Sequence, residues 1–195
     1  MTCIVGLIQG TDVWIGGDSA GSNSSFIMTR KDPKVFRVGE MLMGCCGSFR
    51  MAQLLRCTFE PPAHPDELDV ERYLVGPFID AVRRIFKDGG AATSEKEAER
   101  GTFFLLGYRG GLYRIEHDYH VGQAADGYDA IGSGSDFALG ALHALAATRS
   151  RLTPSERIRI ALEASERSSP SVRGPFVVEQ AEKPQAKGRV TRIAA

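Results

Sequence analysis

The stretch TCIVGLIQGTDVWIGGD, residues 2–18, decides the fold more than any other part of the 195-residue chain. Its two halves are rich in apolar and β-branched residues, and the turn-forming sequence Gln9-Gly10-Thr11-Asp12 separates them. This pattern predicts a β-hairpin with strands over Cys3–Ile8 and Val13–Gly17. Because the second strand of a hairpin ends beside the start of the first, we expect the two ends of this stretch to lie close together.

The rest of the chain alternates between strand-like and helix-like patterns. Gly110-Gly111 is a tight-hairpin signal between two of the strands, and Thr153 with Glu156 forms a capping box at the start of the last helix. In chain order, the predicted segments are strands at Ile27–Thr29, Val35–Val38 and Met41–Cys46, helices at 48–59 and 70–87, strands at Thr102–Arg109, Leu112–His117 and Tyr128–Gly132, helices at 137–147 and 154–167, and a strand at Phe176–Glu179.

The order of these segments predicts an α+β fold. Hairpins dominate the strands, which favours antiparallel sheets over a doubly wound parallel sheet. A pair of helices follows each group of strands, and this order predicts a four-layer αββα sandwich, in which helix pairs flank two antiparallel sheets. We expect a polar loop at 21–25 and an exposed loop of small and charged residues at 88–100.

The composition excludes several classes of protein. Hydrophobic residues make up 43% of the chain and charged residues 25%, and the length predicts a single domain over 1–180, followed by a flexible basic tail over 181–195. The net charge is zero, so nothing favours binding to nucleic acid or to an anionic membrane. No apolar run approaches the roughly 20 residues of a membrane-spanning helix, and the N-terminus lacks the pattern of a signal peptide. We therefore expect a cytoplasmic protein.

The four cysteines are Cys3, Cys45, Cys46 and Cys57. Their spacing matches no zinc-binding pattern, and no other residue cluster indicates a metal site. We expect reduced structural thiols, with no metal and no cofactor.

Thr2 carries the chemistry that the sequence indicates. Aminopeptidases generally remove an initiator methionine that precedes a small residue, so loss of Met1 would leave Thr2 at the N-terminus. That residue would then combine a hydroxyl with a free α-amine, whose pKa of about 7.7–8.0 suits a base near neutral pH. The hairpin brings Asp18 near Thr2, and an Asp18–Lys34 ion pair beside the hydroxyl would lower the hydroxyl pKa.

Three segments together resemble the start of a proteasome β-type subunit, and resemble the HslV-like N-terminal threonine hydrolases still more. They are Thr2–Gly6, Ile15–Asp18 and Lys34–Arg37. Asp18 and Lys34 follow Thr2 by 16 and 32 residues, the separations at which this family places its catalytic aspartate and lysine. The resemblance implies an N-terminal-nucleophile (Ntn) threonine endopeptidase, in which Thr2, Asp18 and Lys34 are catalytic.

The resemblance also assigns roles further along the chain. Gly47, at the end of a strand and the start of a helix, would supply the backbone N–H that stabilises the oxyanion, with Gly44 as a weaker candidate. Ser133, in Gly-Ser-Gly, would hydrogen-bond near the amine of the nucleophile. Gly21, Cys45 and Cys46 would contact substrate.

The last part of the chain departs from the family. Glu166 and Ser169 have the separation of a family Asp and Ser near the active site, but Glu replaces Asp and the segment 170–175 differs, which puts a catalytic role for this region in doubt. Cys3 would be a nucleophile only if Thr2 were also removed.

The resemblance implies a polypeptide substrate and a homo-oligomeric ring, with a separate ATP-dependent unfoldase as a partner. Two alternatives stay open from the sequence. One is a small-molecule amidohydrolase on the same fold. The other is a non-catalytic shell subunit, which retention of Met1 would favour.

Overall fold

The structure is a computed structural model, and it describes residues 2–22, 26–91, 93–95 and 98–181. The predicted hairpin at the N-terminus is confirmed, with Ile4 paired to Gly17 and Gln9 paired to Asp12. Two more strands extend this hairpin into an antiparallel sheet in the order β12-β1-β2-β13. Its strands are β1 (Ile4–Gln9), β2 (Asp12–Gly17), β12 (Tyr128–Ile131) and β13 (Val177–Gln180).

A second antiparallel sheet has the order β11-β10-β9-β6-β5. The predicted hairpin turn is displaced by one residue, because Gly111 pairs with Tyr108 and the turn is made by Arg109-Gly110. Both turn residues have positive φ, 47° and 80°, as a two-residue turn between twisted strands requires. The strands are β5 (Val35–Val38), β6 (Met41–Cys46), β9 (Phe103–Tyr108), β10 (Gly111–Ile115) and β11 (Val121–Gly122).

Two short hairpins correct the predicted loops. Strand β3 (Ala20–Ser22) pairs with β4 (Ile27–Thr29), so Gly21 lies in a strand opposite Met28; residues 23–25 of that predicted loop lie outside the described residues. Strand β7 (Thr93–Glu95) pairs with β8 (Ala98–Arg100) inside the second predicted loop. Strand β4 was predicted with these bounds, whereas β3, β7 and β8 have small or polar side chains and carry too little alternation to be recognised.

The helices follow their capping signals. Helix α1 (Phe49–Cys57) begins after Ser48, whose hydroxyl accepts a hydrogen bond from the backbone of Met51. Helix α4 spans Ser135–Ala147, and α5 (Pro154–Ser168) starts with the predicted capping box.

The helix predicted at 70–87 is observed over nearly the same residues, but a π-helical turn interrupts it. Helix α2 (Val70–Tyr73) leads into a π-helical turn, η1 (Leu74–Phe78), and then into α3 (Ile79–Asp88). Pro77 lies within η1 and has no N–H to donate to the preceding turn, so the backbone widens there instead of continuing as a regular α-helix.

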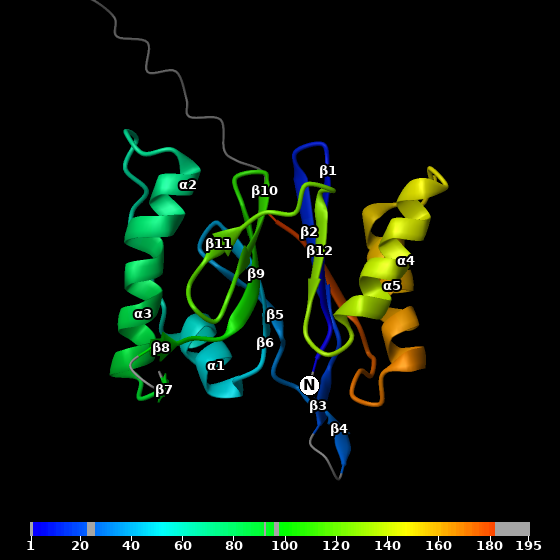
Figure 1. The fold of residues 1–195 in the computed structure, drawn as a ribbon, viewed down its shortest axis with the longest axis horizontal. Coiled ribbons are helices and arrows are strands. Elements are labelled where there is room, and N and C mark those ends of the chain that lie inside the picture. Colours follow the sequence, from blue (N-terminus) through cyan, green and yellow to red (C-terminus); the bar gives the residue numbers. More distant parts are fainter. Residues whose placement is uncertain (1, 23–25, 92, 96–97, 182–195) are drawn as a thin grey trace, which may run out of the picture.

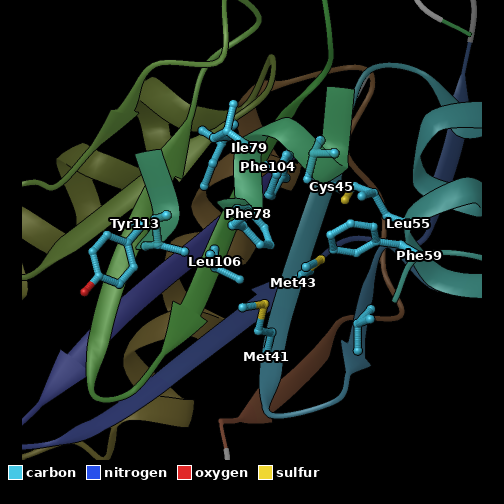
Figure 2. Packing of buried hydrophobic residues seen from close by; sticks show 14 of the residues in the cluster. Met41, Met43, Cys45, Leu55, Phe59, Phe78, Ile79, Phe104, Leu106 and Tyr113 are labelled. Atoms are coloured by element: carbon cyan, nitrogen blue, oxygen red, sulfur yellow. The ribbon is translucent and has the colours of Figure 1, made fainter. Parts of the chain in front are cut away.

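Helices cover the outer faces of the two sheets, which lie against each other in the middle (Figure 1). Helices α1 and α3 pack over the five-stranded sheet, and α4 and α5 pack over the four-stranded sheet. Aromatic and sulfur-containing side chains fill the first of these interfaces, including Met43, Phe78 and Phe104 (Figure 2). Aliphatic side chains such as Leu142 and Leu162, with the alanines Ala138 and Ala161, fill most of the second.

Aliphatic side chains fill the space between the sheets. Ile4, Ile15, Leu42 and Leu105 are each fully buried there, and burial of such side chains stabilises the fold by about 1.5–3 kcal/mol each. This dry layer ends where β1 begins, and Thr2 lies at that end.

Candidate active site

The first hairpin brings Asp18 against the chain entering β1. Ile4 lies opposite Gly17, so Cys3 lies opposite Asp18, one residue beyond the ladder. The amide of Asp18 donates to the carbonyl oxygen of Cys3 at 3.2 Å, and the amide of Cys3 donates to Oδ1 of Asp18 at 3.0 Å. The aspartate is therefore fixed one residue away from Thr2, as the hairpin predicted.

Lys34 enters the same place from the start of β5. Its Nζ lies 2.8 Å from Oδ1 of Asp18, and the two side chains are 5% and 0% exposed. Burial lowers the pKa of Lys34 below its ordinary value, while the charge of Asp18 opposes this effect. A buried pair of this kind is stable only when its remaining polar atoms are satisfied.

Backbone amides satisfy the second oxygen of Asp18. The amide of Ala20 donates to Oδ2 at 3.0 Å, and that of Arg173 donates to the same atom at 3.4 Å. The segment 169–175 therefore supports the aspartate, which the sequence did not reveal. Backbone donors have no residue-type signature, so no signal in the sequence could have identified them.

Glu166 and Ser169 both accept hydrogen bonds from backbone amides of the segment that follows α5. Oε1 of Glu166 accepts from the amide of Gly174 at 2.9 Å and so holds the segment 169–175 in place. Ser169 is buried at the end of α5, where its amide donates to the carbonyl oxygen of Ser165 at 2.8 Å. Their contribution is to the shape of the segment that supports Asp18.

Ser133 approaches Thr2 from the loop after β12. The backbone nitrogen of Thr2 lies 3.4 Å from Oγ of Ser133, and the amide of Gly134 donates to the carbonyl oxygen of Thr2 at 3.3 Å. Gly132 has φ 97°, and a Cβ there would collide with the carbonyl oxygen of Thr2. The glycine thus allows this loop to approach the N-terminal segment closely.

Two clefts meet at Thr2, Cys46 and Gly47. The first is also lined by Lys34, Cys45, Phe49 and Arg56, and the second by Phe103, Arg114, Ser133 and Ser135. Thr2 itself is 4% exposed, so only a small part of it faces the clefts.

The candidate residues are therefore brought together with one exception. Thr2, Asp18, Lys34 and Ser133 make the contacts described above, and Cys45, Cys46 and Gly47 line the clefts beside them. Gly21 lies on β3 and lines neither of these two clefts.

The cysteines near the site are protonated at neutral pH. Burial raises the pKa of Cys3 to about 11 and that of Cys46 to about 12, and it raises the pKa of Cys45 as well. Cys3 is fully buried, with Sγ 3.3 Å from Oγ of Ser165. A thiol in this setting is a poor nucleophile, which argues against Cys3 as the reacting group.

Among the described residues, no group of three or more His, Cys, Asp or Glu side chains is placed to hold a metal ion. No helix in the same part of the chain is long and apolar enough to cross a membrane. The polar groups that line the clefts include the hydroxyl-bearing residues Thr2 and Ser133, and the cations Lys34, Arg56 and Arg114.

Comparison with solved structures identifies proteins of the same fold. BPH from Thiobacillus denitrificans, in a complex with epoxomicin, is 18% identical, with 94% of this chain and 100% of that chain covered and a TM-score of 0.76. HslV from Trypanosoma brucei is 19% identical, with 92% and 98% covered and a TM-score of 0.65. A Gly-1 mutant of Anbu from Hyphomicrobium sp. strain MC1 is 16% identical, with 93% and 82% covered and a TM-score of 0.66.

No family profile and no curated protein matches the sequence. The likeness is therefore one of structure, and it shows that the chain has the Ntn fold of HslV-like, proteasome-type proteins. The predicted resemblance to these proteins and the predicted antiparallel sheets are both confirmed at the level of the fold.

Proposed function

We propose that this protein is a threonine peptidase that hydrolyses peptide bonds, with Thr2 as its N-terminal nucleophile after removal of Met1. The observation that carries the proposal is the buried Asp18–Lys34 ion pair, held one residue from Thr2 at the point where two clefts meet. Burying an ion pair carries a desolvation cost, and such a pair beside a hydroxyl-bearing residue at a cleft is typical of an active site.

The first chemical step forms an ester and releases the amine half of the substrate. The Thr2 hydroxyl attacks the peptide carbonyl, and its proton passes to the α-amine of the same residue, directly or through water. The resulting tetrahedral intermediate collapses when the C–N bond breaks, and the α-ammonium returns the proton to the departing amine. Lys34 favours the oxygen nucleophile because its positive charge stabilises the developing negative charge.

The second step reverses these roles. Water attacks the ester carbonyl while the α-amine of Thr2 accepts its proton, and the Thr2 oxygen leaves with that proton. Gly47 supplies a backbone N–H to the oxyanion in both steps. Ser133, 3.4 Å from the nitrogen of Thr2, orients the amine that carries the proton.

The fold supports the wider proposal. The arrangement of helices around two sheets is consistent with the four-layer αββα sandwich of Ntn hydrolases, and we propose that it is a single domain over 1–180. HslV and BPH share this fold, and by analogy we propose a cytoplasmic homo-oligomeric ring that encloses the sites and acts on polypeptides. A separate ATP-dependent unfoldase would supply unfolded substrate to such a ring.

Hydrolysis of fluorogenic peptide amides by the purified chain tests this proposal. Thr2→Ala should lower kcat/KM by at least about a thousandfold, because the nucleophile is lost, while sedimentation shows an unchanged assembly. Thr11→Ala is the matched control, since Thr11 is exposed at the far end of the same hairpin. Full activity in Thr2→Ala, or equal losses in both variants, would refute the assignment. A monomeric wild type that cleaves only small amides would favour a small-molecule amidohydrolase instead.

A further inference from the structure

Thr102 lies next to the clefts and is buried, and it has none of the roles assigned to other residues above. It is 5% exposed and directly precedes β9. The ladder between β6 and β9 ends with Cys46 opposite Phe103, so Thr102 faces Gly47 just beyond the last pair. Its side chain continues the contact between the two segments where regular strand pairing stops.

The hydroxyl of Thr102 bonds to the backbone on both sides of Gly47. Oγ1 donates to the carbonyl oxygen of Cys46 at 2.5 Å and accepts from the amide of Ser48 at 3.4 Å. Gly47 has φ 91°, and a Cβ at this residue would lie 2.9 Å from Oγ1. The left-handed backbone of Gly47 and the hydroxyl of Thr102 therefore fit each other closely.

The geometry of the peptide bond makes this contact relevant to the clefts. The carbonyl of Cys46 and the N–H of Gly47 belong to one planar peptide group, and in a trans peptide they point in opposite directions. A hydrogen bond that fixes the carbonyl toward Thr102 thereby directs the N–H of Gly47 away from Thr102. Among the described residues, none accepts a hydrogen bond from that N–H, and Gly47 lines both clefts together with Thr2.

We propose that Thr102 is a positioning residue for the oxyanion site, which holds the Cys46–Gly47 peptide so that its N–H faces the reacting carbonyl. This inference rests on the proposed function. A donor aimed in advance at the developing charge stabilises the transition state more than the bound substrate, so its loss lowers kcat more than it raises KM. The hydrogen bond to the carbonyl also polarises the peptide group and strengthens its N–H as a donor.

Steady-state kinetics of Thr102→Val and Thr102→Ser separate this role from a structural one. Valine keeps the shape and removes the hydroxyl, and we expect kcat to fall about ten- to a hundredfold with KM within about twofold of wild type. Serine keeps the hydroxyl, and we expect it to restore kcat to within about threefold. Affinity for a peptide aldehyde, which forms a tetrahedral adduct with the nucleophile, should fall in Thr102→Val by the same factor as kcat/KM.

Two controls keep the outcomes distinct. Thr148→Val removes an exposed hydroxyl that bonds only to helix carbonyls, such as that of Ala144 at 2.9 Å, and should leave kcat unchanged. If thermal melting shows that Thr102→Val is unfolded, Thr102→Ala carries the same comparison without the additional methyl group. An active wild type with unchanged kcat and aldehyde affinity in the hydroxyl-free variant overturns this inference alone. An inactive wild type removes the proposed function and this inference with it.

Discussion

Buried polar side chains gather at both ends of the five-stranded sheet, but in different ways. At one end, beyond Cys46 and Phe103, the Asp18–Lys34 ion pair lies beside Thr2 and two clefts. At the other end, Tyr108 joins His64 and Tyr73 in a hydrogen-bonded cluster beside Pro61 and Pro62.

The polar atoms of the cluster around His64 have hydrogen-bond partners. Nδ1 of His64 lies 3.0 Å from the hydroxyl of Tyr108, and its Nε2 lies 2.8 Å from the carbonyl oxygen of Leu68. Tyr73 stacks on His64 at 4.2 Å and donates to the carbonyl oxygen of Pro62 at 2.7 Å. Burial raises the pKa of Tyr73 to about 12, so its hydroxyl stays a neutral donor.

The difference shows how to distinguish a polar cluster that fastens a loop from one that performs chemistry. The cluster around His64 ties the segment before α2 to the sheet with hydrogen bonds. The Asp18–Lys34 pair concentrates charge next to Thr2, whose hydroxyl is not part of the ion pair. We therefore expect substitutions at the two ends to separate activity from stability.

The largest effect is expected for Lys34→Met. Removal of the ammonium leaves Asp18 as an unpaired buried charge, which should lower the free energy of unfolding by about 3–5 kcal/mol. Activity toward peptide amides should fall at least about a hundredfold, because the buried ammonium that stabilises developing negative charge on Thr2 is lost. Denaturant unfolding and kcat/KM measure the two effects.

The double variant Asp18→Asn/Lys34→Met separates them. With neither charge left, much of the lost stability should return, whereas activity should stay lost. If activity recovered along with stability, the ion pair would be structural, and the two ends of the sheet would be equivalent.

A smaller effect, on stability but not on activity, is expected for Tyr108→Phe. The change removes the hydroxyl partner of His64 and should lower the free energy of unfolding by about 1 kcal/mol, since a part-buried nitrogen loses this hydrogen bond. We expect kcat/KM to stay within about twofold of wild type. A large loss of activity in a folded Tyr108→Phe protein would connect this end of the sheet to the reaction.

The smallest effect concerns the thiols. Cys57 is exposed at the end of α1, whereas Cys3, Cys45 and Cys46 are buried and have raised pKa values. Iodoacetamide at pH 8 should add one label to the native protein, at Cys57, with little change in activity, and four labels after unfolding. Rapid native labelling of Cys46 would mean that the clefts open more widely than the structure indicates.

The two ends also differ in how well the sequence predicted them. The hairpin at residues 2–18 placed Asp18 correctly, because turn residues and strand alternation fix register locally. Lys34 lies in the other sheet, and its place beside Asp18 was expected from its separation from Thr2 in the family resemblance. His64, Tyr73 and Tyr108 were not predicted to meet, because they come from a loop, a helix and a strand, and only tertiary packing joins them.

Backbone contacts set a further limit on prediction from sequence. The amides of Ala20 and Arg173 that hold Asp18, and the amide of Ser48 that reaches Thr102, are present in every residue type except proline. The π-helical turn that contains Pro77 was not predicted either, because apolar side chains continue to recur through this part of the helix. The positions of such groups follow from the whole fold.

Intact mass spectrometry of the purified protein, with and without an epoxyketone probe, tests the central claim most directly. Such probes react with both the hydroxyl and the amine of an N-terminal threonine. We predict a chain that lacks Met1 and gains one probe mass, with no adduct in Thr2→Ala. A chain that retains Met1 and never gains the probe would contradict Thr2 as the nucleophile.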